Sequence, residues 1–235
     1  MTKNKLFKDL KYLILDSEIY DSIRHFIIFF NRTKKIFLTK KSSSEILKYW
    51  QNPNDGNNNP LQYLGKGYFQ NPRAIERSKN LIEIIKSFGI QNPSILEIGC
   101  NVGRNLNALN LAGFKNLNAI EINQNAIDLM NEHFPETHEI TKISVGPTQE
   151  ILKKFKNKKF DIVYSMAVLQ HIPNEDIKNV TQEISRVCGN YLVSYETETY
   201  SSWRHLPRSY KNLYKKINFK YLYRKYGVRV FQKNF

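Results

Sequence analysis

The sequence predicts an α/β fold: a seven-stranded, mostly parallel sheet with a reversed C-terminal edge strand, helices on both faces and a helical N-terminal extension. Two observations predict this class. From residue 94 onward, short runs rich in Ile, Leu and Val alternate with helical patterns, which is typical of βαβ units. Near the C-terminus, two β-patterned runs flank Gly227 without a helical pattern between them, which indicates an antiparallel hairpin.

The chain divides into three parts. Residues 1–48 predict a basic amphipathic helical extension, because apolar residues recur at i, i+3, i+4 and i+7 from Ile23 with Lys and Arg beside them. Residues 49–71 hold an Asn- and Pro-rich turn cluster and predict a lid or linker loop. Residues 72–235 contain the α/β domain.

Within this domain, the strands and helices follow from the apolar pattern and its breakers. The expected strands cover residues 94–98, 117–122, 142–145, 160–164 and 191–195, with the hairpin at 219–223 and 228–232. The expected helices cover residues 72–88, 104–111, 123–132 and 149–155, and one more begins at Pro173. His133 and His138 are expected in a surface loop between a helix and a strand.

The net charge of +15 belongs to the two ends of the chain. Residues 1–48 have eleven Lys or Arg against five Asp or Glu, and residues 203–235 have ten against none. The middle, residues 49–202, is almost neutral, with fifteen against sixteen. Basic ends suit an anionic partner such as nucleic acid, lipid headgroups or an acidic glycan, although a merely solvated basic surface explains them equally well.

Composition excludes several classes of protein. Two cysteines are too few for a disulfide framework or a four-cysteine zinc site, and no cluster has metal-ligand spacing, so we expect no metal. The longest strongly apolar run, Phe26 to Phe30, is far shorter than the roughly 20 residues that span a bilayer. With no signal-peptide pattern, a cytoplasmic location is expected, with peripheral membrane contact through the basic extension as an addition.

The turn after the first strand of the domain carries the first candidate site. Gly99 suits a tight turn, and Gly103 lets the next helix approach the sheet and a ligand. The dinucleotide fingerprint fails, because Asn101 and Arg104 stand at its second and third glycine positions. Glu97 precedes the turn, and a buried carboxylate at a strand end needs a hydrogen-bonding or cationic partner.

A second carboxylate stands at the end of the next strand. Glu121 lies 22 residues after Gly99, a spacing at which a carboxylate accepts hydrogen bonds from ribose hydroxyls. The carboxyl ends of neighbouring strands meet at one edge of an open α/β sheet, so we expect both acids in one ligand site.

These features in this order resemble class I S-adenosylmethionine-dependent methyltransferases of the type 11 or type 12 kind. The resemblance rests on Glu97-x-Gly99-x-Asn101-x-Gly103, on Glu121 and on the stretch 160–172, Phe-Asp-Ile-Val-Tyr-Ser-Met-Ala-Val-Leu-Gln-His-Ile. It covers residues 72–235 and implies a Rossmann-like domain with S-adenosylmethionine as cofactor.

The resemblance also implies a set of cofactor-binding residues. Glu97 would lie near the amino-acid end of the cofactor, Glu121 would hold the ribose, and Ile122 would pack against adenine. The full set is Glu97, Gly99, Cys100, Asn101, Gly103, Glu121, Ile122, Thr148, Ser165, Met166 and, on the preceding helix, Arg77. Two departures stand out: Asn101 replaces the commonest middle glycine, and Gly146-Pro147-Thr148 lacks the acid often found near the adenine amino group.

The expected reaction is O-methylation of a small molecule, a sugar or an envelope glycan intermediate. His171 follows the fourth strand of the domain and is the candidate general base, with a packing role as its alternative. Tyr63, His205 and Arg208 are candidate substrate-binding residues. RNA methylation through the basic ends and a non-catalytic cofactor-binding module stay open; nucleic acid is less favoured, because residues 165–168 lack an Asn/Asp-Pro-Pro-aromatic motif.

Overall fold

The computed structural model describes residue 23, residues 26–27, 41–53, 58–64 and 71–234. Most of the predicted N-terminal extension therefore lies outside the described residues. The strands are β1 (Ile95–Ile98), β2 (Leu117–Glu121), β3 (Thr141–Val145), β4 (Phe160–Met166), β5 (Cys188–Tyr195), β6 (Phe219–Lys225) and β7 (Val228–Lys233). The longer helices are α3 (Ser43–Gln51), α5 (Pro72–Ser87), α6 (Arg104–Leu111), α7 (Gln124–His133) and α10 (Asn174–Val187). Shorter helices are η3 (Pro60–Tyr63), α8 (Pro135–Ile140), α9 (Thr148–Ile151), η4 (Leu152–Lys154), η5 (Leu169–His171) and α11 (Tyr210–Lys215).

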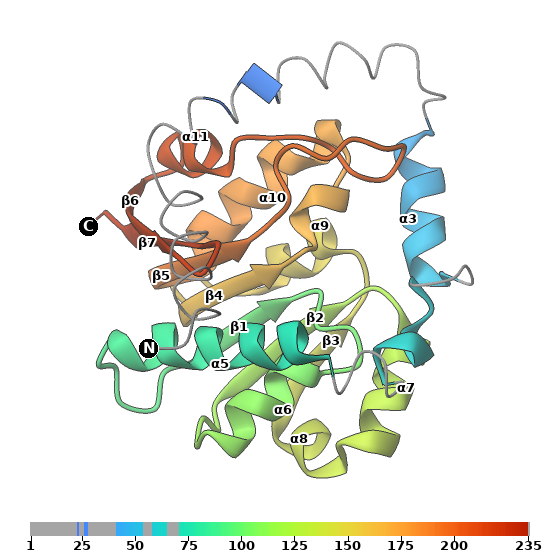
Figure 1. The fold of residues 1–235 in the computed structure, drawn as a ribbon, viewed down its shortest axis with the longest axis vertical. Helices are drawn as coiled ribbons and strands as arrows, with labels where there is room; N and C mark the ends of the chain where they lie inside the picture. The colour runs from blue at the N-terminus through green and yellow to red at the C-terminus, as the bar shows by residue number, and fades with distance from the viewer. Residues whose placement is uncertain (1–22, 24–25, 28–40, 54–57, 65–70, 235) are drawn as a thin grey trace, which may run out of the picture.

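The seven strands form one sheet in the order β3-β2-β1-β4-β5-β7-β6 (Figure 1). The pairs from β3 through β5 are parallel, and β7 is antiparallel to both β5 and β6. The predicted fold class is confirmed. The reversed strand is the C-terminal strand β7, which lies one position in from the edge because β6 takes the edge.

Apolar side chains from alternate strand positions form a core on each face of the sheet. On one face, Leu96 and Ile98 of β1 pack with Ile184 of α10 and with Tyr214 of α11. On the other face, Ile95 packs with residues of α5, α6 and α7. Figure 1 shows α5, α6 and α8 on one side of the sheet and α10 and α11 on the other. Covering both faces removes the apolar strands of a parallel sheet from water.

Three helical segments differ from the sequence prediction. The expected loop that holds His133 and His138 is wrong, because α7 ends at His133 and α8 contains His138. α11 was not predicted. α3 runs across the expected division between residues 48 and 49, and Figure 1 shows it on the side toward which β1 and β4 point.

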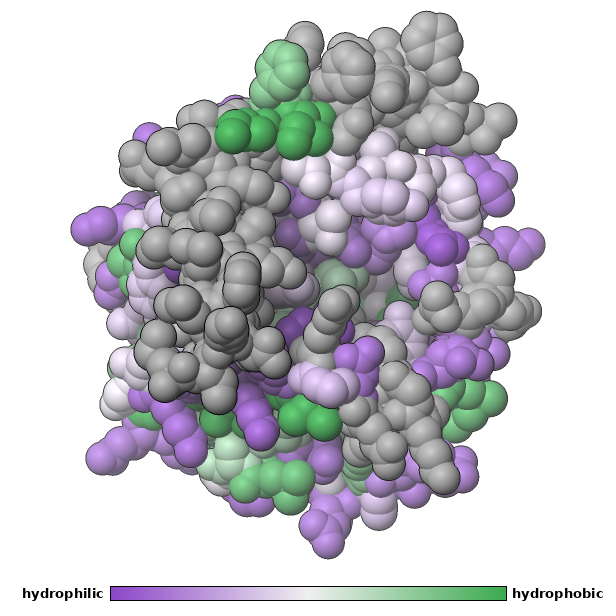
Figure 2. Space-filling model, in the orientation of Figure 1, coloured by the Kyte–Doolittle hydropathy of each residue, from purple (hydrophilic) through white to green (hydrophobic). Residues whose placement is uncertain are grey.

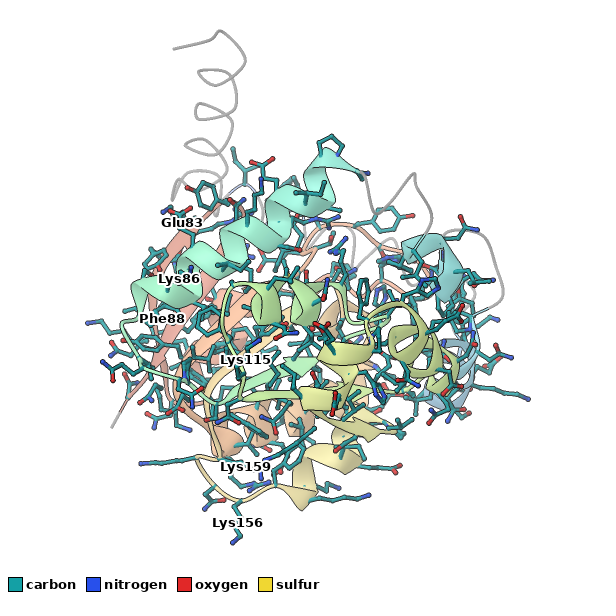
Figure 3. All side chains as sticks on the ribbon, turned by 90° about the horizontal axis from the view of Figure 1, so that it is seen from below. Glu83, Lys86, Phe88, Lys115, Lys156 and Lys159 are labelled. Atoms are coloured by element: carbon teal, nitrogen blue, oxygen red, sulfur yellow. The ribbon has the colours of Figure 1, made fainter. Side chains whose placement is uncertain are left out.

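Lysines gather near the amino end of β4, away from the strand ends that face α3. The near-zero net charge of residues 49–202 does not reveal this cluster, because acidic residues elsewhere balance it. Residues 153–159 contain five lysines, all exposed, in the segment that leads into β4. Figure 3 shows Lys86, Lys115, Lys156 and Lys159 along one side of the molecule. The face in Figure 2 is largely hydrophilic among the residues coloured there, with scattered apolar side chains. No helix among the described residues is long and apolar enough to cross a membrane.

Candidate functional site

The turn between β1 and α6 has a backbone that excludes side chains at two positions. Gly99 has φ +70°, and a Cβ there would lie 2.5 Å from Cγ2 of Val168. Gly103 has φ +72° and caps α6, and a Cβ there would lie 2.4 Å from Sδ of Met130. The two glycines therefore keep an open cradle at the carboxyl end of β1.

Asn101 keeps this cradle in place of the usual glycine. Its φ of +50° lies in the left-handed region, which Asn tolerates better than most side chains. Its Oδ1 accepts a hydrogen bond from the Val102 amide at 2.8 Å. Its own amide donates to Oε2 of Glu121 at 2.7 Å. The substitution thus preserves the turn and connects it to the second carboxylate.

Glu121 is fixed by backbone amides at the end of β2. Besides the Asn101 amide, those of Ile122 and Asn123 donate to its Oε1 at 2.9 and 3.0 Å. Burial raises the pKa of this carboxyl, and the three amides partly offset that shift because they favour the ionised form. The result is an oriented carboxylate that lines the cavity.

Glu97 is the more deeply buried acid, with 1% of its surface exposed. Its Oε1 accepts a hydrogen bond from Nδ2 of Asn105 at 2.9 Å, and the Tyr164 hydroxyl and the Arg104 guanidinium also act on the carboxyl group. Burial raises the pKa of Glu97 to about 8. A buried carboxyl group beside a glycine cradle fits the ammonium end of an amino acid, which would supply both a donor and a positive charge.

Both acids face one cavity of about 300 Å³. Most of the predicted site residues line it: Arg77, Glu97, Gly99, Cys100, Asn101, Glu121, Ile122, Thr148, Met166, Tyr63, His171 and His205. These predicted residues come from several strand ends, helices and loops, and the fold brings them to one cavity. Among the described residues, no group of three or more His, Cys, Asp or Glu side chains has a geometry that would hold a metal ion.

Three predicted residues do not line this cavity. Gly103 is the N-cap of α6 and packs against Met130. Ser165 is fully buried, and its Oγ donates to Glu196 at 2.8 Å. Arg208 is 3% exposed and donates to the carbonyl oxygens of Leu169, at 2.6 Å, and Ile172. The aromatic and basic pattern around Arg208 suggested a pocket wall, but this placement makes the guanidinium a clamp on the loop that carries His171.

His171 is held as a neutral imidazole. Its Nδ1 lies 2.7 Å from the Arg204 carbonyl oxygen, which only accepts, so Nδ1 carries the proton. Its Nε2 then accepts from Nε2 of Gln170 at 3.2 Å. Burial lowers the pKa of His171 to about 3. The ring therefore lines the cavity with an unprotonated Nε2 that is held by Gln170.

Gln170 and Glu196 are residues of the site and its supporting loop that the sequence reasoning missed. Oε1 of Gln170 accepts from the Thr197 amide at 2.7 Å, which fixes its amide group toward His171. Glu196 accepts from the Val168 and Gln170 amides at 3.2 and 3.1 Å and holds the same loop. No sequence signal marks these contacts, since each joins segments more than twenty residues apart.

Four aromatic rings form a series of tilted and edge-to-face contacts that begins at the cavity and ends at the surface. The ring of Trp50, from α3, lies 4.3 Å from that of His171, centroid to centroid. His171 lies 4.6 Å from His205, and His205 lies 4.8 Å from Tyr200. Trp50 also lines the cavity. The predicted lid segment thus contributes a side chain to the site itself.

The fold and the site are similar to those of class I S-adenosylmethionine-dependent methyltransferases. Residues 96–190 match the model of the family described as "Methyltransferase domain". The predicted resemblance to this class and the predicted cofactor, S-adenosylmethionine, are confirmed.

Individual relatives are more distant. A ribosomal protein L11 methyltransferase from Staphylococcus aureus (strain JH1) is 27% identical over 113 residues, which cover 48% of this chain and 35% of that protein. The chain thus matches only about a third of the length of this curated relative. A solved protein from Pyrococcus horikoshii OT3 has a TM-score of 0.60 at 16% identity and covers 74% of this chain and 99% of its own. A phosphoethanolamine N-methyltransferase from Haemonchus contortus, solved with S-adenosyl-L-methionine, has a TM-score of 0.55 at 15% identity and covers 74% of this chain and 44% of its own. At these identities the solved structures show the fold.

Proposed function

We propose that this protein transfers a methyl group from S-adenosylmethionine to an oxygen of a small-molecule acceptor. The observation that carries the proposal is the shared cavity: Glu97, Glu121 and the neutral His171 all line it. Glu97 suits the ammonium end of the cofactor, and Glu121 suits its ribose hydroxyls. When bound, the cofactor supplies a methyl group on a sulfonium, which is a good leaving group.

The protein's contribution is alignment and proton removal. Holding the acceptor oxygen in line with the methyl group contributes about 7–11 kcal/mol at best. A hydroxyl acceptor must also lose its proton, and Nε2 of His171 is the candidate to accept it. The Arg204 carbonyl fixes the ring for this role, because it holds the other proton on Nδ1. Gln170 must release Nε2 as the acceptor enters.

Calorimetric titration with S-adenosylhomocysteine, with NADH as the control, tests the cofactor half of the proposal. Micromolar binding of the first and none of the second is expected. Transfer of labelled methyl groups to a panel of hydroxyl compounds then tests the reaction. Binding of S-adenosylhomocysteine without transfer to any acceptor oxygen, across small molecules and glycans, would favour the non-catalytic module.

A peripheral membrane contact is a separate proposal about location. Ile23, Phe26 and Ile27 fall on one face of the predicted helix, and their exposed fractions are 51%, 71% and 37%. Exposed apolar residues beside basic ones suit an anionic bilayer surface. Flotation with vesicles of anionic and of zwitterionic lipid tests this. Phe26→Ser is expected to weaken binding to anionic vesicles, and equal flotation of both proteins would contradict the proposal.

A further inference from the structure

The cavity divides into a charged half and an apolar half. The charged half comes from α5, β1, α6 and β2 and holds Arg77, Glu97, Arg104 and Glu121. The apolar half comes from α3 and from the segment after β4. It is lined by Ile46, Leu47, Trp50, Val168, Ile172 and Pro173. Since the charged half matches the polar ends of the cofactor, the apolar half is left for the acceptor.

The apolar half contains one hydrogen-bond donor without a partner. Nε1 of Trp50 is buried and makes no hydrogen bond with the described residues. A buried indole N–H normally finds an acceptor, because leaving it unpaired costs free energy. The tilted contact of Trp50 with His171 places this ring beside the candidate base. The unpaired donor therefore indicates that a ligand brings an oxygen acceptor to this wall.

The two histidines of the wall are uncharged. His171 carries its proton on Nδ1, as the Arg204 carbonyl requires. Oγ of Ser202 accepts from the Arg204 and His205 amides at 3.3 and 3.1 Å, so its hydroxyl proton is left for Nδ1 of His205 at 2.7 Å. Burial lowers the pKa of His205 to about 4. Neutral rings favour a neutral acceptor over a carboxylate or a phosphate.

The guanidinium of Arg204, the cation near this wall, contacts aromatic side chains outside the cavity. The Arg204 guanidinium lies 5.3 Å from the Tyr49 ring and 5.4 Å from the Trp203 ring. Its Nη1 also donates to the Tyr49 hydroxyl at 2.7 Å. Within the part of the chain that the structure describes, this half of the cavity has no carboxylate for a cationic amine.

The candidate base, His171, also limits which acceptor hydroxyls can react. A buried histidine of lowered pKa removes a proton from an acidic hydroxyl far more readily than from an aliphatic one. A phenol has a pKa of about 10, whereas an aliphatic hydroxyl is close to water at roughly 16. A sugar hydroxyl is therefore a poor match, in contrast to the range of acceptors that the sequence left open.

We propose that the acceptor is a flat, neutral, mainly apolar molecule with an acidic hydroxyl, of the phenol or enol class, which lies against the Trp50–His171–His205 wall. One of its oxygens accepts a hydrogen bond from Nε1 of Trp50, and the hydroxyl oxygen faces Nε2 of His171. This inference rests on the proposed function. In the reaction, the oxygen–methyl bond forms, the methyl–sulfur bond breaks with its electron pair on sulfur, and the hydroxyl proton passes to His171.

The two tryptophans of the chain provide a direct test, since Trp50 lines the cavity and Trp203 does not. The probes are catechol, methyl glucoside and phosphoethanolamine, added to protein saturated with S-adenosylhomocysteine. In Trp203→Phe, catechol is expected to quench the emission of Trp50. By calorimetry, catechol should bind at least about tenfold more tightly than either other probe.

Trp50→Phe keeps the ring but removes the N–H donor. It is expected to weaken catechol binding about fivefold to tenfold, while S-adenosylhomocysteine binding stays the same and shows that the variant is folded. Trp203→Phe, the matched control, should leave catechol affinity unchanged. Tighter binding of methyl glucoside or phosphoethanolamine, or an unchanged catechol affinity in Trp50→Phe, would overturn the inference. If the unmodified protein does not bind S-adenosylhomocysteine, the proposed function is overturned instead.

Discussion

The two halves of the cavity differ in how they are built. The cofactor half is local: Glu97, Asn101 and Glu121 come from two neighbouring strand ends, and backbone amides hold the second carboxylate. The acceptor half is assembled from distant segments, since Trp50 meets His171 and the Arg204 carbonyl fixes His171. The cofactor half can be predicted from the sequence because short motifs encode it. The acceptor half cannot, because long-range packing brings its residues together.

The largest expected effect is on the acceptor half. His171→Asn removes the ring nitrogen that faces the cavity, and general-base catalysis typically contributes about 10²–10⁴-fold to the rate. Turnover should fall by that factor while S-adenosylhomocysteine affinity stays unchanged. His133→Asn, a change of an exposed histidine, is the control. Near-normal turnover of His171→Asn would mean that the ring only shapes the pocket.

Glu121→Ala probes the cofactor half. It removes the candidate ribose partner and leaves three amides without their acceptor. The dissociation constant of S-adenosylhomocysteine, measured by calorimetry, is expected to rise about 100-fold, equivalent to about 3 kcal/mol. Glu136→Ala, at an exposed position in α8, should change nothing. A small effect at Glu121 would show that the ribose is held elsewhere.

Glu97→Gln should give a smaller loss in the same half. Gln has the shape of Glu97 but no charge for an ammonium group, so S-adenosylhomocysteine should bind about tenfold more weakly. The same calorimetric series measures it. Unchanged affinity would show that Glu97 does not bind the ammonium group of the cofactor.

The raised pKa of Glu97 also predicts how stability depends on pH. The folded carboxyl has a pKa of about 8 against an ordinary value of 4.5, so the folded state binds more protons between these values and loses stability as pH rises. His171 acts in the opposite direction, but only below 6.5. Between about pH 6.5 and pH 8, the free energy of unfolding in urea should therefore fall. Glu97→Gln should flatten this decline in part, because Glu196, with a pKa of about 7, also contributes. An equal slope in both proteins would contradict the assignment.

The smallest expected effect is at the turn. Asn101→Gly relieves a left-handed φ but loses the hydrogen bond from the Val102 amide to Oδ1. Both terms are of order 1 kcal/mol and oppose each other. Thermal stability and S-adenosylhomocysteine affinity should thus stay close to those of the unmodified protein. A large gain in affinity would show that Asn101 obstructs the cofactor.

Sequence patterns predicted the sheet and the cofactor half because both depend on local rules. Strand runs, glycine turns and strand-end acids stand in fixed order. α8 was not predicted, because a six-residue helix has too short a periodic pattern to be distinguished from a loop. Arg208 was misassigned because a basic, aromatic segment has the same composition whether it lines a pocket or clamps a loop. Gln170 was missed because its contacts with Glu196 and Thr197 join segments far apart in the chain.

The position of β7 has a consequence for synthesis. β7 lies between β5 and β6, so β6, although translated earlier, has no neighbour in the sheet until β7 emerges. The buried pair of Glu198 and Arg229 joins the acceptor-side segment to that same last strand. The segment that follows β5 therefore gains its buried ion pair only once β7 has inserted between β5 and β6.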